Sequence, residues 1–108
     1  MKTDKFLTDL GLAKRAGRAC FGFDEVEKRL ELGEVKRVYI TSDSAANTEK
    51  RITRMCEHYG TPLTKIPFDI YDIGNATGRK PTEVFAVLDK GFEALVTKSL
   101  EMMNGGNA

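Results

Sequence analysis

Two short runs of β-branched and aromatic residues constrain the fold of this chain most strongly. They occupy residues 37–41 (RVYIT) and 83–88 (EVFAVL), and each has the length and composition of a buried strand. The first is expected to be a central strand. Two further extended segments are shorter, residues 19–21 and residues 62–67, and prolines bracket the second, which places it nearer a sheet edge. The chain is therefore expected to form a four-stranded sheet.

Segments with helical spacing of apolar residues separate these strands, and capping residues or glycines mark their ends. The five predicted helices run from Thr3 or Asp4 to near Gly17, from Gly22 to Gly33, from a cap within Ser42-Asp43-Ser44 to about Tyr59, from Asp69 to Gly78, and from about Lys90 to Met103. Helices alternating with short strands imply an α/β fold, a three-layer α/β/α sandwich around a small mixed, largely parallel four-stranded sheet. One domain is expected over residues 1–103, followed by a frayed tail over residues 104–108.

The charge balance excludes strong nonspecific attraction to nucleic acid, because 31% of the residues are charged but the net charge is only +1. Cys20 and Cys56 lie far apart outside any CxxC pair, and both are predicted to be buried free thiols in a reducing compartment. No apolar run reaches signal-peptide or membrane-spanning length. The protein is therefore expected to be soluble and cytoplasmic, without a membrane partner.

Residues that enzymes usually need are scarce. His58 is the only histidine, and Cys56 lies on a diverging helical face, so the pair does not indicate a metal site. Residues 74–80 (GNATGRK) lack the GxxxxGK[ST] spacing of a phosphate-binding loop and follow a helix rather than a strand. Neither catalysis nor a cofactor nor a small-molecule substrate is predicted.

The segment that begins at Gly22 is a better candidate for a functional site, one that binds RNA. Asp24 and Glu25 stand in the first turn of the predicted helix, where carboxylates are electrostatically favoured, and Lys28 follows one turn later. If this turn lies beside basic loops, cations can hold phosphates while the acidic pair accepts hydrogen bonds from guanine N1 and N2. The alternative is that these are unrelated surface charges on an ordinary capped helix. The basic loops in question contain Arg18, and then Arg79, Lys80, Pro81 and Thr82.

The order of several short motifs resembles the kink-turn-binding ribosomal protein L7Ae superfamily, in particular its bacterial YlxQ-like branch. The resemblance covers nearly the whole chain and is carried by residues 10–16, 22–33, 42–48, Cys56, 73–78 and 86–92. It implies an α/β/α fold that grips the sharply bent RNA motif called a kink-turn, with no cofactor and no reaction. In such complexes a Gly-Thr-Asn-Glu signature at the start of the second helix enters the major groove at tandem sheared G·A pairs.

The signature transfers to this chain in part. Gly22 matches its glycine, Glu25 its glutamate and Lys28 the following lysine, whereas Phe23 replaces the threonine and Asp24 the asparagine. An ionised carboxylate only accepts hydrogen bonds, whereas an amide also donates them. The resemblance thus implies a noncatalytic, ribosomal-protein-like binder of kink-turn or similar structured RNA. The alternative is a protein-interaction module that keeps the fold but has lost RNA recognition. The candidate RNA-binding residues are Arg18, Gly22, Phe23, Asp24, Glu25, Lys28, Arg79, Lys80, Pro81 and Thr82.

Overall fold

The computed structural model describes residues 4–106, in which helices and strands alternate along the chain. The elements are α1 (Lys5–Arg15), β1 (Ala19–Phe21), α2 (Phe23–Glu31), β2 (Arg37–Ile40), α3 (Ala46–Tyr59), β3 (Leu63–Lys65), α4 (Ile70–Thr77), β4 (Val84–Val87) and α5 (Lys90–Gly106). Every strand and helix that the sequence predicts is present. The predicted tail over residues 104–108 begins within α5, and residues 107–108 lie outside the described residues.

The four strands form one mixed sheet in the order β1-β4-β2-β3. The inner position of β2 and the edge position of β3 confirm the predictions for these strands. The prediction of a largely parallel sheet is wrong, because β4 is antiparallel to both of its neighbours and only β2 and β3 are a parallel pair. Strands β1, β2 and β3 do run in one direction, but β4 enters between β1 and β2 and separates them.

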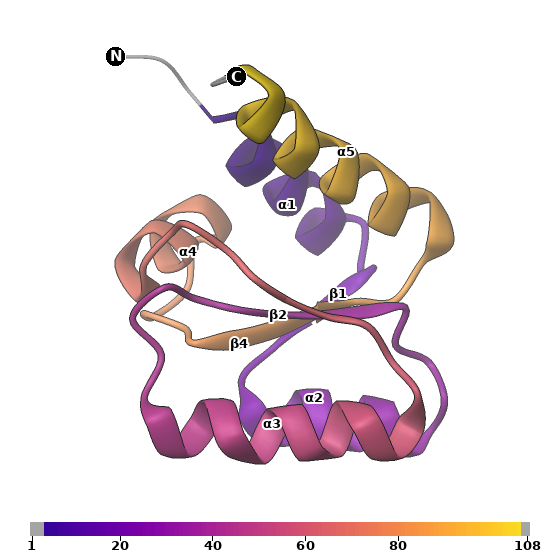
Figure 1. Cartoon of the computed structure of the whole chain (residues 1–108). Helices are drawn as coiled ribbons and strands as arrows, with labels where there is room; N and C mark the ends of the chain where they lie inside the picture. The colour runs from indigo at the N-terminus through magenta and orange to yellow at the C-terminus, as the bar shows by residue number, and fades with distance from the viewer. Residues whose placement is uncertain (1–3, 107–108) are drawn as a thin grey trace.

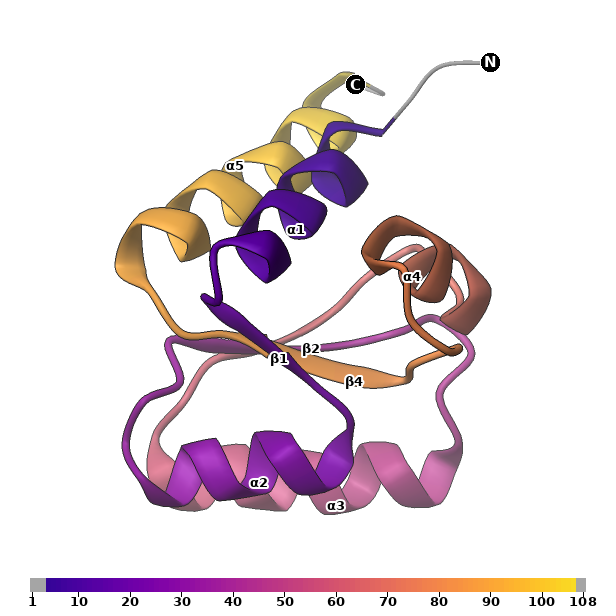
Figure 2. The ribbon, with the colours of Figure 1, turned by 180° about the vertical axis from the view of Figure 1, so that it is seen from behind.

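Helices cover both faces of the sheet, which confirms the three-layer α/β/α architecture. Figure 1 shows α1, α4 and α5 on one face and α2 and α3 on the other, and the view from behind in Figure 2 shows the same separation. Two apolar clusters fill the spaces between the layers. Tyr39 and Phe85 stack in the first cluster with ring centroids 5.1 Å apart, whereas their neighbours Val38 and Ile40 point into the second.

The loops contain both expected and unexpected caps. Asp69 caps α4 as predicted, since its carboxylate accepts hydrogen bonds from the N–H groups of Tyr71 and Asp72. The prediction that Ser42, Asp43 or Ser44 caps α3 is wrong: Ala45 occupies the N-cap position, without a side-chain bond. Asp43 instead accepts a hydrogen bond of 3.2 Å from the N–H of Ile70, at the start of α4.

The first helix is tied to the last by a buried polar contact. The hydroxyl of Ser99 in α5 donates a hydrogen bond of 2.6 Å to Asp9 in α1, and both side chains are buried. Asp4 occupies the N-cap position of α1 without making a capping bond, and the other predicted cap, Thr3, lies outside the described residues. Within residues 4–106, no helix is both long and apolar enough to cross a lipid bilayer.

Candidate nucleic-acid interface

One end of the sheet brings together several loops that are distant in sequence. The register pairs Phe21 with Phe85 and Ile40 with both Val84 and Lys65, so the last residues of β1, β2 and β3 lie at the same end of the sheet as the first residues of β4. The β1–α2 turn, the β2–α3 loop and the α4–β4 loop therefore leave the sheet at the same end. We call this end the loop end.

Gly22 forms the turn between β1 and α2. Its backbone angles, φ 98° and ψ 148°, lie in a region that is essentially restricted to glycine. The Gly22 N–H donates a hydrogen bond of 2.8 Å to the carbonyl oxygen of Val84, which fixes the turn against the start of β4. Apart from its chain neighbours Phe21 and Phe23, no described residue has an atom within 4 Å of a Cβ added at Gly22, so the backbone is open on that side.

The α4–β4 loop is held against α4 by its backbone. The Arg79 N–H donates a hydrogen bond of 2.9 Å to the carbonyl oxygen of Gly74. Gly74 has to lack a side chain, because a Cβ there would lie 2.9 Å from the Arg79 carbonyl oxygen and 3.0 Å from that of Lys80. The loop thus presents Arg79, Lys80 and Pro81 to solvent from a fixed backbone. Gly22 and Arg79 thus lie at the same end of the sheet, as the hypothesis that basic loops lie beside the Gly22 turn requires.

Two arginines stack on the aromatic residues that flank Gly22. The Arg79 guanidinium carbon lies 5.2 Å from the centroid of the Phe21 ring. The Arg51 guanidinium carbon, which α3 supplies, lies 4.3 Å from the centroid of the Phe23 ring. Both distances are typical of cation–π contacts. Arg51 is absent from the sequence-derived candidates, since the sequence shows only that it lies on the polar face of a helix and not which ring it covers.

The carboxylates at the start of α2 differ in their surroundings. Asp24 is exposed, whereas Glu25 accepts a hydrogen bond of 3.0 Å from the Nε of Arg29 through its Oε2 atom. Arg29 also donates a hydrogen bond of 2.6 Å to Glu34, and these two carboxylates raise the pKa of the Arg29 guanidinium. Lys28 is exposed one turn beyond Asp24. Glu25 therefore keeps one carboxylate oxygen, Oε1, for a partner.

Two of the ten candidate residues do not lie on this surface. The Arg18 carbonyl oxygen accepts a hydrogen bond of 2.9 Å from the N–H of Leu88, which follows β4. Arg18 is thus at the opposite end of β1 from Gly22, so the hypothesis that basic loops lie beside the Gly22 turn is wrong for the Arg18 loop. Thr82 is only 7% exposed and donates its hydroxyl hydrogen to the Lys80 carbonyl oxygen, so its side chain stabilises the loop from inside.

Buried polar atoms at the loop end have no hydrogen-bond partner in the described part of the chain. They are the Thr41 and Ser44 hydroxyl oxygens and one carboxylate oxygen of Glu83. Backbone bonds hold these residues together, because the Thr41 N–H donates to the Glu83 carbonyl oxygen and the Ser44 N–H donates to that of Thr41. The sequence pattern assigns Thr41 and Glu83 to two different strands and Ser44 to a loop, and it does not predict that they meet.

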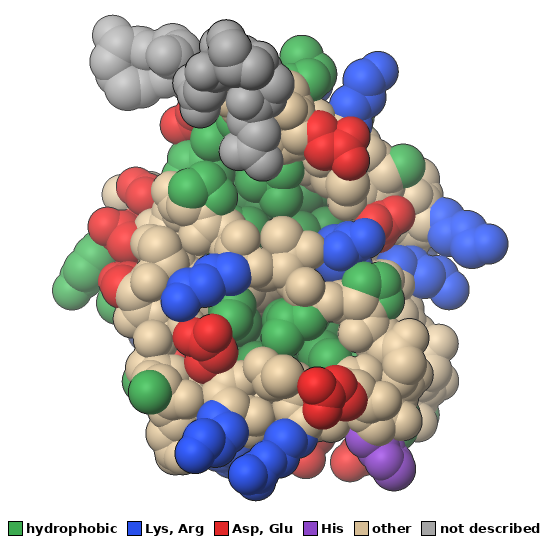
Figure 3. Space-filling model, viewed as in Figure 1, with side chains coloured by type: hydrophobic (Ala, Val, Ile, Leu, Met, Phe, Trp, Pro, Cys, Tyr) green, Lys and Arg blue, Asp and Glu red, His purple; other side chains and the backbone are tan. Residues whose placement is uncertain are grey.

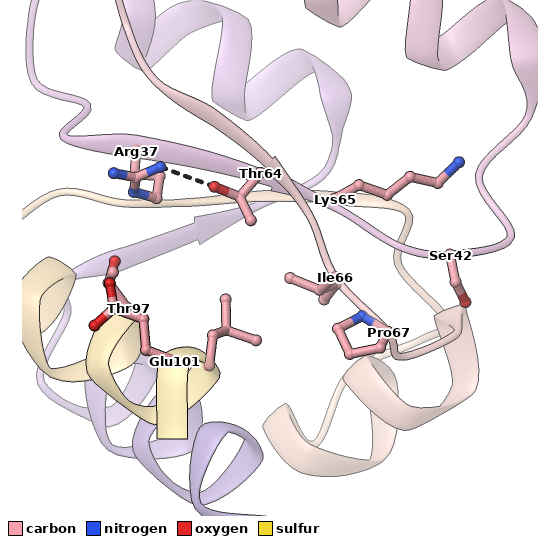
Figure 4. Close-up of a pocket in the computed structure, with 9 residues that line it drawn as sticks. Arg37, Ser42, Thr64, Lys65, Ile66, Pro67, Thr97 and Glu101 are labelled. Carbon is pink, nitrogen blue, oxygen red and sulfur yellow. Dashed lines mark hydrogen bonds between the residues drawn. The ribbon is translucent and has the colours of Figure 1, made fainter. Parts of the chain in front are cut away.

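The cavity along β3 is separate from the candidate RNA-binding residues. Figure 3 shows acidic and basic side chains interspersed around a hollow lined by apolar side chains. A cavity of about 660 Å³ lies along β3 against α5, where Arg37 donates a hydrogen bond of 2.8 Å to Thr64 (Figure 4). None of the ten candidates lines it. The side chains that the structure describes contain no cluster of three potential metal ligands around His58 or elsewhere.

The two thiols are buried in the second apolar cluster. Both Cys20 and Cys56 are free, and burial raises the pKa of each to about 11. Their predicted burial is confirmed.

Comparisons with a family model and with individual proteins agree on one family. The sequence model of the ribosomal protein L7Ae/L30e/S12e/Gadd45 family matches residues 4–97. The chain is 36% identical over 83 residues to the RNA-binding protein YlxQ of Bacillus subtilis, covering 77% of this chain and 82% of that protein. It is 29% identical over 101 residues to the YlxQ protein of Enterococcus faecium, covering 94% of this chain and 93% of that one.

Solved structures show the same fold. A protein of unknown function from Bacillus halodurans C superposes with a TM-score of 0.83 at 29% identity, covering 92% of this chain and 99% of that one. The 15.5kD RNA binding protein of Giardia lamblia superposes with a TM-score of 0.72 at 20% identity, covering 94% of this chain and 86% of that one. At that identity the second likeness concerns the fold alone.

Proposed function

Because the chain belongs to the ribosomal protein L7Ae/L30e/S12e/Gadd45 family, we propose that it binds structured RNA containing a kink-turn or a similarly bent, G·A-paired element. The role is binding without catalysis, in keeping with relatives that are named as RNA-binding proteins. Two buried free thiols suit a reducing compartment, so we place the protein in the cytoplasm.

The main observation that supports the proposal is the hydrogen bond from the Gly22 N–H to the Val84 carbonyl oxygen. It holds the β1–α2 turn against the start of β4, directly after the α4–β4 loop, so the open backbone of Gly22 and the exposed side chains of Arg79 and Lys80 form one surface. Cations on that surface suit phosphates, and the carboxylates of Asp24 and Glu25 suit the N–H donors of guanine.

The affinity has to come from these local contacts, since the net charge is only +1. A protein that relied on its overall field would bind any duplex of equal length about equally. Recognition through a shaped surface instead favours an RNA whose backbone bends to meet that surface.

Calorimetric titration tests the proposal, with a kink-turn RNA beside an unbent duplex of equal length at one stated salt concentration. The kink-turn RNA should bind at least about 100-fold more tightly, within the range by which specific sites exceed nonspecific ones. Equal affinity for the two RNAs, or no binding by a folded protein, would overturn the proposal.

A protein-interaction module on the same fold is the second candidate. It is favoured by Asp24, an exposed carboxylate where the resemblance implies an amide, and by the pairing of Glu25 with Arg29. A carboxylate repels phosphate and cannot donate a hydrogen bond to a base. Absence of RNA binding by a protein with a cooperative unfolding transition would favour this candidate.

A further inference from the structure

The two stacked arginines differ from the paired arginines near them. Arg29 and Arg37 bond to carboxylates, at 2.6 Å to Glu34 and 2.8 Å to Glu93. Arg51 and Arg79 are exposed, and neither takes part in an ion pair with a carboxylate of the described residues. Their full positive charge is available to a partner.

An aromatic ring orients a guanidinium without consuming its hydrogen-bond donors. The ring covers one face of the planar group, and the N–H donors point outward around the edge, in the fork that matches a phosphate. A long exposed arginine loses rotamer freedom when it binds, and a ring that already restrains it reduces that loss. Phe21 and Phe23 therefore prepare Arg79 and Arg51 for a bidentate anionic partner.

The chain positions these two groups on either side of one residue. Phe21 and Phe23 are separated only by Gly22, and their arginines come from different elements, the α4–β4 loop and α3. The Gly22–Val84 hydrogen bond fixes the backbone between Phe21 and Phe23 against the start of β4. The two guanidinium groups thus flank the open backbone at Gly22.

We propose that Arg51 and Arg79 form a phosphate clamp that grips the RNA backbone on the two sides of Gly22, with Phe23 acting as the positioning residue for Arg51. This inference rests on the proposed function. It reassigns Phe23, which belongs to the sequence-derived candidates, from an RNA contact to the support of one. It also adds Arg51, which lies in a helix outside the candidate loops.

The clamp accounts for binding by a protein of low net charge. Asp24 places a negative charge at the start of α2, but a cation held at a fixed point on each side of the turn offsets the repulsion of nearby phosphates. Two cations at defined positions can therefore hold phosphates without an excess of positive charge elsewhere on the surface.

Arg51→Gln and Arg54→Gln provide a matched comparison. Both residues are exposed on α3, and both substitutions remove one positive charge, but only Arg51 stacks on an aromatic ring among the described residues. Arg51→Gln should weaken kink-turn binding about 5- to 20-fold. It should also reduce the magnitude of the slope of log affinity against log salt concentration by about 1. Arg54→Gln should change affinity less than about 2-fold and leave the slope as it is.

Phe23→Leu tests the positioning role, because it removes the ring while keeping the charge of Arg51 and an apolar side chain. It should weaken binding by a similar factor to Arg51→Gln, whereas Phe23→Tyr, which keeps the ring, should bind like the wild type. Thermal unfolding of each variant shows whether the fold is retained.

The outcomes separate the clamp from the proposed function. If the folded wild type does not prefer the kink-turn RNA to the duplex, both the proposed function and the clamp are overturned. If it does, and Arg51→Gln behaves like Arg54→Gln, the clamp is wrong while RNA binding stands. If Arg51→Gln alone weakens binding and Phe23→Leu does not, Phe23 is not the positioning residue.

Discussion

The N–H of Gly22 and the carbonyl oxygen of Val84 are joined by a hydrogen bond of 2.8 Å, so the turn that opens α2 and the first residue of β4 are held as one unit. In this turn the Gly22 backbone has a φ of 98° and a ψ of 148°. Any residue with a Cβ atom is strained in that conformation, although the space beside it is empty.

Gly22→Ala should therefore lower the free energy of unfolding by about 1 to 3 kcal/mol through backbone strain. Urea unfolding monitored by circular dichroism measures the change. Gly33→Ala is the control, because Gly33 has a φ of 74° in the milder left-handed helical region and should cost about 1 to 2 kcal/mol. A Gly22→Ala cost clearly below that of Gly33→Ala would contradict the assignment of strain.

Gly74→Ala should act through crowding rather than strain. The added Cβ would lie 2.9 Å from the Arg79 carbonyl oxygen, a backbone atom that cannot move without the loop. Overpacking of this kind costs about 1 to 3 kcal/mol in unfolding free energy and should displace the Arg79–Phe21 stack. Asn75→Ala, on the exposed side of the same helix, should leave both stability and RNA affinity near those of the wild type.

Positions 24 and 25 should respond in opposite directions in RNA titrations. Asp24→Asn should tighten kink-turn binding by about 1 to 3 kcal/mol, because it removes a charge near phosphate and provides a donor to base edges. Glu25→Gln should weaken binding, since a charged acceptor makes stronger bonds to guanine N–H groups than an amide does. Both substitutions remove one negative charge, so equal effects of the same sign would indicate bulk charge alone.

Cys20 and Cys56 should be nearly inert toward thiol reagents. Burial raises the pKa of each thiol to about 11, so only about one thousandth of either is thiolate at pH 8. A bulky aromatic disulfide reagent at pH 8 should label the native protein far more slowly than the denatured protein. Rapid stoichiometric labelling of the native state would contradict this expectation.

The ion pair between Arg37 and Glu93 should make stability depend on pH. The hydrogen bond from Arg37 lowers the pKa of the Glu93 carboxyl in the folded state. The pair therefore stabilises the fold above the pKa of an unfolded glutamate, about 4.3, and this stabilisation is lost as the pH falls through the lower folded-state value.

Arg37→Gln should accordingly lower the unfolding free energy at pH 7 by about 1 kcal/mol, since both side chains are partly exposed. The difference from the wild type should shrink below pH 4, as urea unfolding at both pH values would measure. Glu101→Gln, on the same helix but without an ion pair among the described residues, should show little change at either pH. A difference that is constant with pH would show that packing, not charge, explains the Arg37 variant.

The sequence predicts the elements of this fold well because each depends on local chemistry. Glycines end the helices and β-branched residues form the strands, and neither signal needs distant contacts. Strand direction does depend on such contacts. The pattern of β4 does not reveal that it inserts between β1 and β2, and the carboxylate of Asp43 resembles a cap for α3 although it bonds to Ile70 of α4.

The candidate surface is also predictable only where it depends on the order of the elements along the chain. Gly22 and Arg79 meet because strand ends gather loops, which the alternating order of elements implies. Arg18 has the right charge, but the length of β1 separates it from the loop end, and Thr82 has the right place in the chain, but its side chain points inward. The stack of Arg51 on Phe23 depends on how α3 crosses α2, which no local pattern specifies.

The empty space over Gly22 affects how the surface can be dissected. A molecule that rests there touches peptide atoms, including the first-turn N–H groups that no intrahelical acceptor reaches. Such contacts are encoded by the course of the main chain, so truncating side chains one at a time leaves them in place. An alanine scan of this protein will therefore assign too little of any binding energy to the turn, and the residue without a side chain will be the one whose contribution it misses most.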